Sequence, residues 1–326
     1  MKAIRIHKAG SVDELKYEEV DTPVPDKNEV LIKVISASVN FADVMVRKGF
    51  YPMMPTLPAI PGVDCSGIVE SIGENVTRFR RGQRVAALGQ GCYADYMATN
   101  AVDVFPISED IDMDEAAAIP VNYLTAYHML HTMARVREGQ TILSYAAAGG
   151  VGTAVIQLAK LAGVTAIGLT STDEKADFAR TQGYDHIINY KGEDVVQRVK
   201  EITGGRGADI ILNSAAGDTF RRDFEMLAPL GQIIWLGMAA GLPEGNLTEL
   251  LGMGFAKSVG VRTFMLPSIF ELDPRLMARS SEILYNDLAD GKIKPHIFER
   301  IPLYKAARAH ELLESGTVQG KLILKP

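Results

Sequence analysis

A glycine-rich turn between an apolar strand and an apolar helix constrains the fold more than any other segment of this 326-residue chain. Ala146, Gly149 and Gly152 have the spacing of the GxGxxG motif, with alanine in the first place. Such a turn lets the backbone approach a pyrophosphate, and the next helix offers unpaired amide groups and the positive end of its dipole. We therefore predict that a dinucleotide binds here, on Ala148, Gly149, Gly150, Val151 and Gly152.

Strands and helices alternate on both sides of this turn. Strands are predicted at 141–145, 165–169, 186–189, 209–213, 232–236 and 258–264, and helices at 125–134, 152–162, 173–182 and 195–203. This alternation predicts an α/β fold with a doubly wound parallel sheet of the Rossmann type.

The two ends of the chain have a different pattern. Short strands are predicted at 2–7, 15–20, 30–39, 65–72, 83–88 and 91–99, separated by Pro and Gly clusters, and a helix opens at 114–118. They indicate a barrel-like β domain. The tail, with helices at 274–290 and 305–314, an extended stretch at 294–302 and a strand at 320–325, is expected to rejoin that domain. The sequence therefore predicts the first part of the β domain at 1–120, the Rossmann domain at 121–266 and the tail that rejoins the β domain at 267–326.

The end of the second Rossmann strand indicates which dinucleotide binds. NAD-binding folds usually carry an acidic residue there for the ribose 2′-hydroxyl. Here the strand ends in hydroxyl side chains, Thr170 and Ser171, and Lys175 follows one turn into the next helix. Hydroxyl groups and a lysine suit a phosphate dianion, which a carboxylate would repel. We predict NADPH, although Lys175 could also be a solvated surface residue.

Composition excludes several classes of protein. The net charge of −6 argues against nucleic-acid binding, which needs a basic surface. The two cysteines are too few for a disulfide framework. The uncharged stretch 139–159 is broken by the glycine turn, so a membrane span is not expected. With no targeting segment recognised, a cytoplasmic location is expected.

Several motifs, in order along the chain, resemble the quinone oxidoreductase branch of the medium-chain dehydrogenase/reductase superfamily. They are Val39-Asn-Phe-Ala-Asp43, Pro61-Gly-Val-Asp64, Asn122-Tyr-Leu-Thr-Ala-Tyr-His128, the 146–152 turn, Asn213-Ser-Ala-Ala-Gly217 and Gly320-Lys-Leu-Ile-Leu324. The resemblance implies a GroES-like β domain built from both chain ends around a central Rossmann domain. It also implies a homodimer formed through the Rossmann domain, with the strand 258–264 at the dimer edge.

The resemblance also implies where the nicotinamide lies. It places Asn40, Asp43, Tyr51, Asn122 and Thr125 nearby, with Asn40, Asp43, Tyr51 and Thr125 as catalytic candidates and Asn40, Asn122 and Thr125 also as cofactor contacts. Tyr51 could donate a hydrogen bond to a developing oxyanion or simply pack. Asp43 could equally be a structural acceptor.

Further cofactor contacts are expected at other positions. Tyr190, by resemblance, approaches the adenosine ribose or its phosphate. Other candidates lie at the ends of successive strands, at the carboxyl edge where ligands of such sheets lie. They are Ser214, Leu236, Gly237, Met238 and Phe264. Lys321 reaches the cofactor from the tail, or else is a surface lysine.

A metal ion is not expected. Where the zinc branch of the superfamily carries a catalytic cysteine and a Gly-His-Glu, this chain has Asn40 and Gly62-Val-Asp64. Zinc needs Cys, His or carboxylate ligands, and Asp43 alone cannot hold it. His128 and His131 lie three residues apart without an evident third ligand.

These features predict a zinc-independent enzyme that reduces quinones with NADPH. One alternative is an NADPH-dependent reductase of α,β-unsaturated carbonyls, because the same scaffold does both and fold does not decide function. A second alternative is an NADPH-binding protein without catalysis, or one that interacts with RNA.

Overall fold

The computed structural model describes the backbone of residues 1–326 and every side chain except that of Pro274. The chain divides into two compact units, one formed by Met1–Leu124 with Asp273–Pro326 and the other by Thr125–Leu272. The sequence placed these boundaries at 120/121 and 266/267. The first lies later because Val121 and Asn122 bond to residues of the first unit. The second lies later because helix α9 (Pro267–Leu272) belongs to the second unit.

The first unit, here called the β unit, is built on a seven-stranded sheet. Its order is β14 (Ile297–Pro302), β15 (Lys321–Lys325), β3 (Glu29–Val39), β4 (Asp64–Ile72), β5 (Arg84–Leu88) and β7 (Val104–Pro106), and β6 (Tyr96–Asn100) also pairs with β3. A hairpin of β1 (Lys2–Arg5) and β2 (Lys16–Glu19) lies beside it. One apolar core joins residues from both ends of the chain, including Ile4, Ile32 and Leu324.

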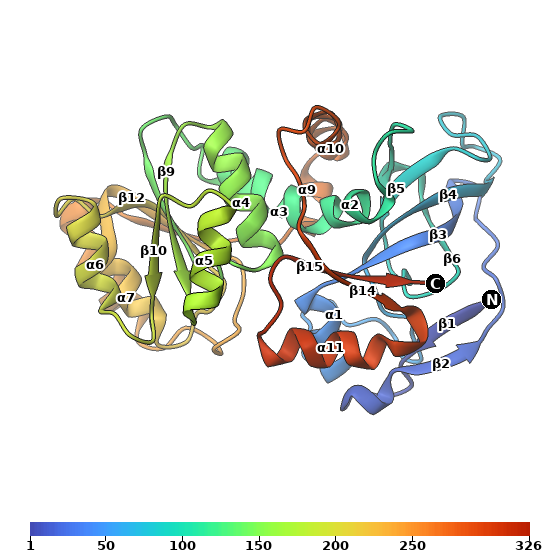
Figure 1. The fold of residues 1–326 in the computed structure, drawn as a ribbon, viewed down its shortest axis with the longest axis horizontal. Coiled ribbons are helices and arrows are strands. Elements are labelled where there is room, and N and C mark those ends of the chain that lie inside the picture. Colours follow the sequence, from blue (N-terminus) through green and yellow to red (C-terminus); the bar gives the residue numbers. More distant parts are fainter. The chain divides into compact units, whose positions relative to one another are not determined.

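The tail enters this sheet next to its longest strand. Strand β15 pairs antiparallel with β3, with Leu322 opposite Val39. Figure 1 shows the red C-terminal helix α11 (Ala306–Ser315) beside the blue α1 (Phe41–Lys48). The tail therefore rejoins the N-terminal domain, as expected. The remaining helical elements of this unit are η1 (Val12–Glu14), η2 (Ala101–Asp103), α2 (Met113–Ala118), η3 (Ile119–Tyr123), α10 (Pro274–Ala289) and η6 (Leu303–Lys305).

The second unit, here called the Rossmann unit, contains a parallel sheet of six strands. Their order is β10 (His186–Asn189), β9 (Thr165–Thr170), β8 (Thr141–Ser144), β11 (Ala208–Asn213), β12 (Leu227–Trp235) and β13 (Gly260–Thr263). Strand order reverses between β8 and β11, and ligands of such sheets lie at the carboxyl ends of strands at that switch point.

Helices cover the strands of the Rossmann unit. They are α3 (Leu124–Tyr127), which begins at the unit boundary, η4 (His128–Met133), α4 (Gly150–Leu161), α5 (Asp173–Thr181), α6 (Val195–Ile202), α7 (Thr219–Met226), α8 (Leu247–Gly254), η5 (Phe255–Lys257) and α9. Figure 1 shows α4 to α7 around β9, β10 and β12. The core between sheet and helices contains Leu143, Ile167, Ile211 and Phe224.

Some predicted elements differ from the structure. The strand expected at 91–99 is confined to Tyr96–Asn100, because Gly91 has a φ of 94° and the chain turns before the ladder begins. Helices α1, α7 and α8 were not predicted. Each has eight residues, too short for the apolar period of a helix to repeat clearly.

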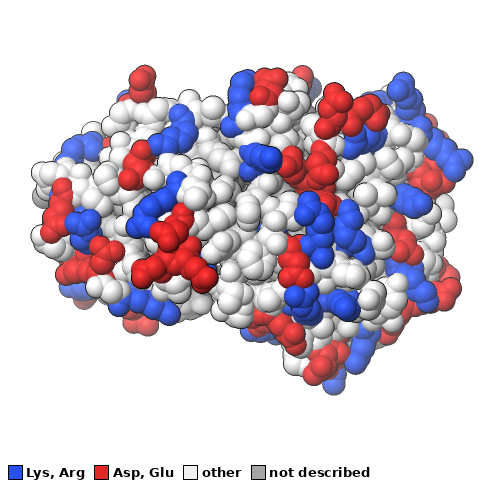
Figure 2. All heavy atoms as spheres, in the orientation of Figure 1, with Lys and Arg blue, Asp and Glu red and all other residues white. Residues whose placement is uncertain are grey.

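None of the helices among the described residues is long and apolar enough to cross a membrane. Acidic and basic side chains are interspersed over the face drawn in Figure 2, consistent with the modest net charge of −6.

Candidate functional site

The glycine turn lies where the sequence placed it, directly after β8. Gly149 precedes the first residue of α4, and a Cβ on Gly152 would come within 2.5 Å of the Ala146 carbonyl oxygen and 2.6 Å of that of Ala147. Only glycine allows this close approach of helix and turn. The amides of Gly150, Val151 and Gly152 form the first turn of α4, where no preceding turn of helix accepts them. The turn can therefore receive phosphate oxygens on backbone N–H groups.

The end of β9 presents hydroxyl groups, as predicted. Thr170 is buried, and no partner for its Oγ1 is found among the described residues. Ser171 follows, and Thr172 caps α5 by accepting a hydrogen bond from the Lys175 amide at 3.3 Å. The nearby carboxylate of Asp173 accepts a hydrogen bond from Asn189 Nδ2 at 3.0 Å. One oxygen of the carboxylate that follows the strand, Asp173 Oδ1, is thus bonded within the protein.

Two lysines, Lys175 and Lys191, carry positive charge beside this strand end. Partial burial, and then the charge of Lys191, lower the pKa of the Lys175 ammonium. Two ammonium groups that repel each other favour an anion between or beside them. The sequence had singled out Lys175 for this purpose, but it had not included Lys191 among the site residues.

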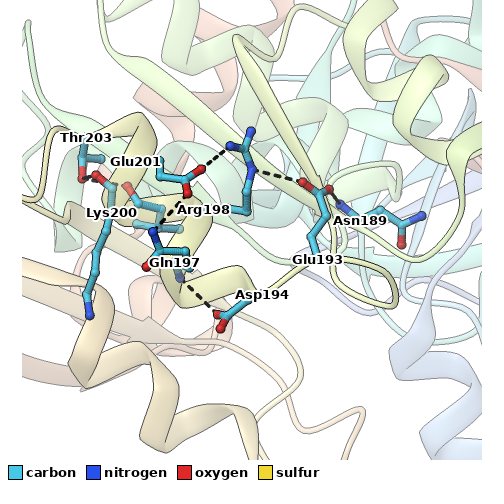
Figure 3. Close-up of polar contacts among 9 residues, drawn as sticks. Asn189, Glu193, Asp194, Gln197, Arg198, Lys200, Glu201 and Thr203 are labelled. Atoms are coloured by element: carbon cyan, nitrogen blue, oxygen red, sulfur yellow. Dashed lines mark hydrogen bonds and ion pairs between the residues drawn. The ribbon is translucent and has the colours of Figure 1, made fainter.

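The loop that carries Tyr190 and Lys191 also contains Glu193, which ties it to Arg198 on α6 by an ion pair. Glu193 accepts the Asn189 amide at 2.7 Å and the Arg198 guanidinium at 3.1 Å, and Arg198 also pairs with Glu201. Figure 3 shows Arg198 bridging the two glutamates. Tyr190 is 48% exposed, so its ring is available to a ligand.

The remaining residues of the Rossmann unit that are predicted to contact the cofactor lie just after the ends of neighbouring strands. Ser214 follows β11, and Leu236, Gly237 and Met238 follow β12. A Cβ on Gly237 would lie 2.8 Å from the Ser214 carbonyl oxygen, so this glycine lets the two loops touch. Phe264 is buried after β13, and its amide donates to the Trp235 carbonyl at 2.8 Å.

In the β unit, a buried polar cluster joins the two chain ends. Lys321 is 4% exposed, so the alternative of a surface lysine is wrong. Its Nζ donates to Asn40 Oδ1 at 2.5 Å and to Asn122 Oδ1 at 3.4 Å. Burial lowers the pKa of the Lys321 ammonium. One of its three N–H donors is left after these two bonds.

Asp64, which the sequence had not placed in the site, completes this cluster. Its Oδ1 accepts from Ser38 Oγ at 2.6 Å and Asn40 Nδ2 at 2.7 Å, and its Oδ2 accepts from the Val121 amide at 3.2 Å. Burial raises the pKa of the Asp64 carboxyl. The Asn40 carboxamide is thus held at both ends, its oxygen by Lys321 and its nitrogen by Asp64. The motif Pro61-Gly-Val-Asp64 was the signal that could have identified this residue.

Asp43 and Tyr51 lie near this cluster. Asp43 Oδ2 accepts from the Asn40 amide at 2.8 Å and from Tyr93 Oη at 3.1 Å, whereas its Oδ1 is buried with no partner among the described residues. Burial raises the pKa of Asp43 to about 7. Tyr51 packs on the apolar core, and burial and the charge of Asp43 raise the pKa of its phenol. Asp43 therefore has a structural role at the start of α1, and its protonation state responds near neutral pH.

Thr125 and the histidines belong to the Rossmann unit. Thr125 is a buried residue of α3. His128 Nδ1 contacts Thr132 Oγ1 at 2.9 Å, and burial lowers its pKa to about 4. Among the described residues, His, Cys, Asp and Glu side chains form no group of three or more that could hold a metal ion.

The predicted site residues thus form two groups. Asn40, Asp43, Tyr51, Asn122 and Lys321 belong to the β unit, and the other predicted contacts belong to the Rossmann unit. Within the β unit the structure joins Asn40, Asn122 and Lys321 by hydrogen bonds. Within the Rossmann unit it places the glycine turn, the hydroxyl strand end and the lysines at the carboxyl ends of adjacent strands.

Family models match both units. A model described as an alcohol dehydrogenase GroES-like domain matches residues 26–109, and one described as a zinc-binding dehydrogenase matches residues 150–278. The predicted α/β class, with a GroES-like domain and a Rossmann sheet, is confirmed.

Relatives that match this chain over nearly their whole length are described as quinone oxidoreductases. A quinone oxidoreductase of Pseudomonas aeruginosa is 35% identical, over 100% of this chain and 99% of that protein. One of Rattus norvegicus is 31% identical, over 99% and 97%. The crystal structure of Escherichia coli quinone oxidoreductase complexed with NADPH matches with a TM-score of 0.94 and 33% identity, over 100% of both chains. The similarity therefore extends over both units.

Proposed function

The chain belongs to the quinone oxidoreductase branch of the medium-chain dehydrogenase/reductase superfamily, and from that premise we propose that it reduces quinones with NADPH and without a metal ion. It is an oxidoreductase. This excludes the alternative of a protein without catalysis.

The glycine turn is the observation that carries the proposal. The missing side chain of Gly152 lets α4 come against the turn, so that consecutive amides converge at the switch point of the sheet. Phosphates need such donors because an anion removed from water must recover its hydrogen bonds. Residues 148–152 would hold the pyrophosphate. When bound, NADPH supplies the hydride.

The group at the end of β9 supports NADPH over NADH. Thr170 brings a buried hydroxyl without a partner, and Lys175 and Lys191 bring positive charge. Asp173, which could otherwise bind a ribose hydroxyl, is bonded to Asn189. Tyr190, exposed beside Lys191, would lie against the adenosine end. This chemistry suits a 2′-phosphate better than a free hydroxyl.

The polar cluster of the β unit supports hydride transfer to a carbonyl-type acceptor. Lys321 occupies the oxygens of both carboxamides, so the amide hydrogens of Asn122 point elsewhere. No described residue accepts from Asn122 Nδ2, which leaves it to donate to a carbonyl oxygen of the nicotinamide or the acceptor. Hydrogen-bond donors fixed in advance stabilise charge that develops on such an oxygen. Tyr51 would contribute a further hydroxyl group in the β unit, and Thr125 remains a candidate of the Rossmann unit. A quinone's reduced form takes its proton from water.

Zinc independence is part of the proposal. Asn40 is engaged by Lys321 and Asp64, and Asp43, whose Oδ1 has no partner among the described residues, belongs to no group of three or more potential metal ligands there. Elemental analysis of the purified protein should therefore find zinc far below one atom per chain. Stoichiometric zinc that is needed for turnover would contradict this part.

Substitution of Lys175 by alanine tests the cofactor assignment. Loss of a charge-assisted hydrogen bond costs about 1.5–3 kcal/mol, so the Kd for NADPH should rise roughly 10- to 150-fold. The Kd for NADH should stay nearly unchanged. Lys160→Ala is the matched control, because Lys160 pairs with Asp185 on the surface of the same unit. Equal effects of Lys175→Ala on the two coenzymes would remove the case for a phosphate site.

Single-turnover oxidation of NADPH with a panel of acceptors tests the substrate class. Quinones should be reduced faster than α,β-unsaturated carbonyls of similar size. The reverse order would favour an enone reductase on the same site.

A homodimer formed through the Rossmann unit is also proposed. Strand β13 is an edge of its sheet, and an unpaired edge can pair with a second copy. Nearby apolar side chains are exposed, with Phe255 at 86% and Leu247 at 54%. Light scattering coupled to size exclusion should give twice the chain mass of 35.4 kDa. A monomer at micromolar concentration would exclude it.

A further inference from the structure

Two alanines in left-handed conformations lie at neighbouring strand ends of the Rossmann unit. Ala146, after β8, has a φ of 49°, and Ala216, after β11, has a φ of 56°. The two strands are adjacent, with Ser144 paired to Leu212. A left-handed backbone costs about 1 kcal/mol or more for a residue with a Cβ, and it persists only where its surroundings hold it.

A single buried carboxylate, that of Asp223 on α7, connects the two turns. Tyr145 Oη donates to Asp223 Oδ1 at 2.7 Å, and Asn213 Nδ2 donates to Asp223 Oδ2 at 2.5 Å. Tyr145 precedes Ala146, and Asn213 is the last residue of β11. The Asp223 side chain is 0% exposed, so it can act on a ligand only through these two residues.

Asn213 connects Asp223 to the second turn, which contains Ala216, by hydrogen bonds. Its Oδ1 accepts the amides of Ala215 and Ala216, each at 2.8 Å, and its Nδ2 also donates to Thr219 Oγ1 at 3.0 Å. Thr219 Oγ1 in turn donates to the Ala216 carbonyl at 2.7 Å. The carboxamide thus makes four hydrogen bonds, its full capacity.

The first turn depends on the same anchor. Tyr145 is bonded to α7 at its hydroxyl and to β11 at its backbone, where its amide donates to the Leu212 carbonyl at 3.1 Å. Ala146 follows directly, and its carbonyl oxygen is the one that the missing Cβ of Gly152 accommodates. A shift of Tyr145 would therefore move the carbonyl against which α4 packs.

We propose that Asp223 is a positioning residue for dinucleotide binding, which holds the glycine turn and the 214–217 loop in register with each other. The proposal rests on the proposed function and deepens it. Both turns lie apart from the end of β9 that is proposed for the 2′-phosphate, so they would serve the part of the coenzyme common to NADPH and NADH. Asp223 therefore sets affinity for both coenzymes alike, in contrast to Lys175, which acts on the 2′-phosphate alone.

Titration of NADPH and NADH into Asp223→Asn and Tyr145→Phe tests this assignment, with quenching of protein fluorescence as readout. In Asp223→Asn an amide nitrogen faces one of two donors, so we expect the Kd for both coenzymes to rise about 10-fold. Tyr145→Phe removes one hydrogen bond and should raise both by a smaller, equal factor. At saturating NADPH, kcat should stay close to wild type, because the variants change binding and not the reacting groups.

Two control variants separate positioning from general stability. Asp209→Asn removes a carboxylate that bonds Thr141 and Arg206 at the opposite end of β11. Tyr285→Phe removes a buried hydroxyl that donates to the Ala116 carbonyl in the β unit. Both should lower the melting temperature and leave coenzyme affinity unchanged.

The outcomes are distinct. Three results would overturn the positioning role. The first is wild-type affinity for both coenzymes in folded Asp223→Asn and Tyr145→Phe, the second is a loss of affinity confined to NADPH, and the third is an equal loss of affinity in the two control variants. If Asp223→Asn does not fold, Tyr145→Phe decides the matter by the same criteria. Failure of the wild-type protein to bind either coenzyme would instead refute the proposed function.

Discussion

Each of the two units carries a candidate site, and the two sites are built in opposite ways. In the β unit the site consists of buried side chains, some charged, whose partners are far away in the chain: Lys321 and Asn40 are separated by 281 residues. In the Rossmann unit it consists mainly of backbone amides and turns at the ends of parallel strands, with lysines that are partly exposed to solvent.

The difference shows in the electrostatics. Burial raises the pKa of Asp43 to about 7 and lowers that of the Lys321 ammonium. Charges placed in the interior are costly unless their hydrogen bonds are complete. Amide dipoles carry no net charge, so the glycine turn needs no such compensation. We therefore expect substitutions in the β unit to affect stability most, and those in the Rossmann unit to affect coenzyme binding most.

The largest expected effect is that of Lys321→Met. Removing one member of a buried charged cluster leaves two carboxamide oxygens and Asp64 without their cation, and such changes cost about 3–5 kcal/mol. The free energy of unfolding, measured with urea, should fall by that amount. Lys325→Met in the same strand is the control: Lys325 is more exposed, and its partner Asp114 keeps Arg300. A loss no greater than that of the control would show that the buried cluster adds nothing.

Gly152→Ala should have a smaller effect on stability but a larger one on coenzyme binding. The new Cβ would lie 2.5 Å from the Ala146 oxygen, and overpacking of this kind costs about 1–3 kcal/mol. Because α4 must move away from the turn, the Kd for NADPH should rise at least about 10-fold by fluorescence titration. Gly192→Ala, where a Cβ meets nothing within 4 Å, is the control. Unchanged affinity in Gly152→Ala would mean that the coenzyme does not depend on this turn.

The smallest effect concerns pH. The pKa of Asp43 rises from 3.8 to about 7 on folding, so the folded state holds its proton more tightly. Its contribution to stability is therefore full below pH 3.8 and declines as pH rises to about 7. Asp43→Asn should flatten the profile of melting temperature against pH over this window.

Asp114 gives a comparison of opposite sign in the same unit. Burial raises the pKa of its carboxyl, but hydrogen bonds from Lys325, Ser36 and Arg300 outweigh this and lower it overall. Asp114 therefore stabilises the fold above pH 3.8, and Asp114→Asn should lose that stability at neutral pH. If both variants shifted the pH profile in the same direction, the contrast between the two carboxylates would be wrong.

Much of the Rossmann unit could be predicted, because its signals are local. The residues 146–152 lie within one turn, and the alternation of strands and helices shows in short windows of sequence. The β unit was predicted in outline only. The role of Asp64 was missed because a single aspartate after Pro-Gly-Val looks like a turn residue until its three donors, from distant segments, are seen.

The sequence alone determined the order of the elements, the glycine turn and the absence of an acid at the tip of the second Rossmann strand. These follow from spacing along the backbone, which local sterics and hydrogen bonding fix. Only the tertiary structure decided that Lys321 is buried between Asn40 and Asn122, and that Asp223 joins the two left-handed turns. Such contacts exist because strand β15 pairs with β3, and because α7 lies against β11 and β12. The burial and partners of a side chain depend on that closure of the chain and not on its neighbours in sequence.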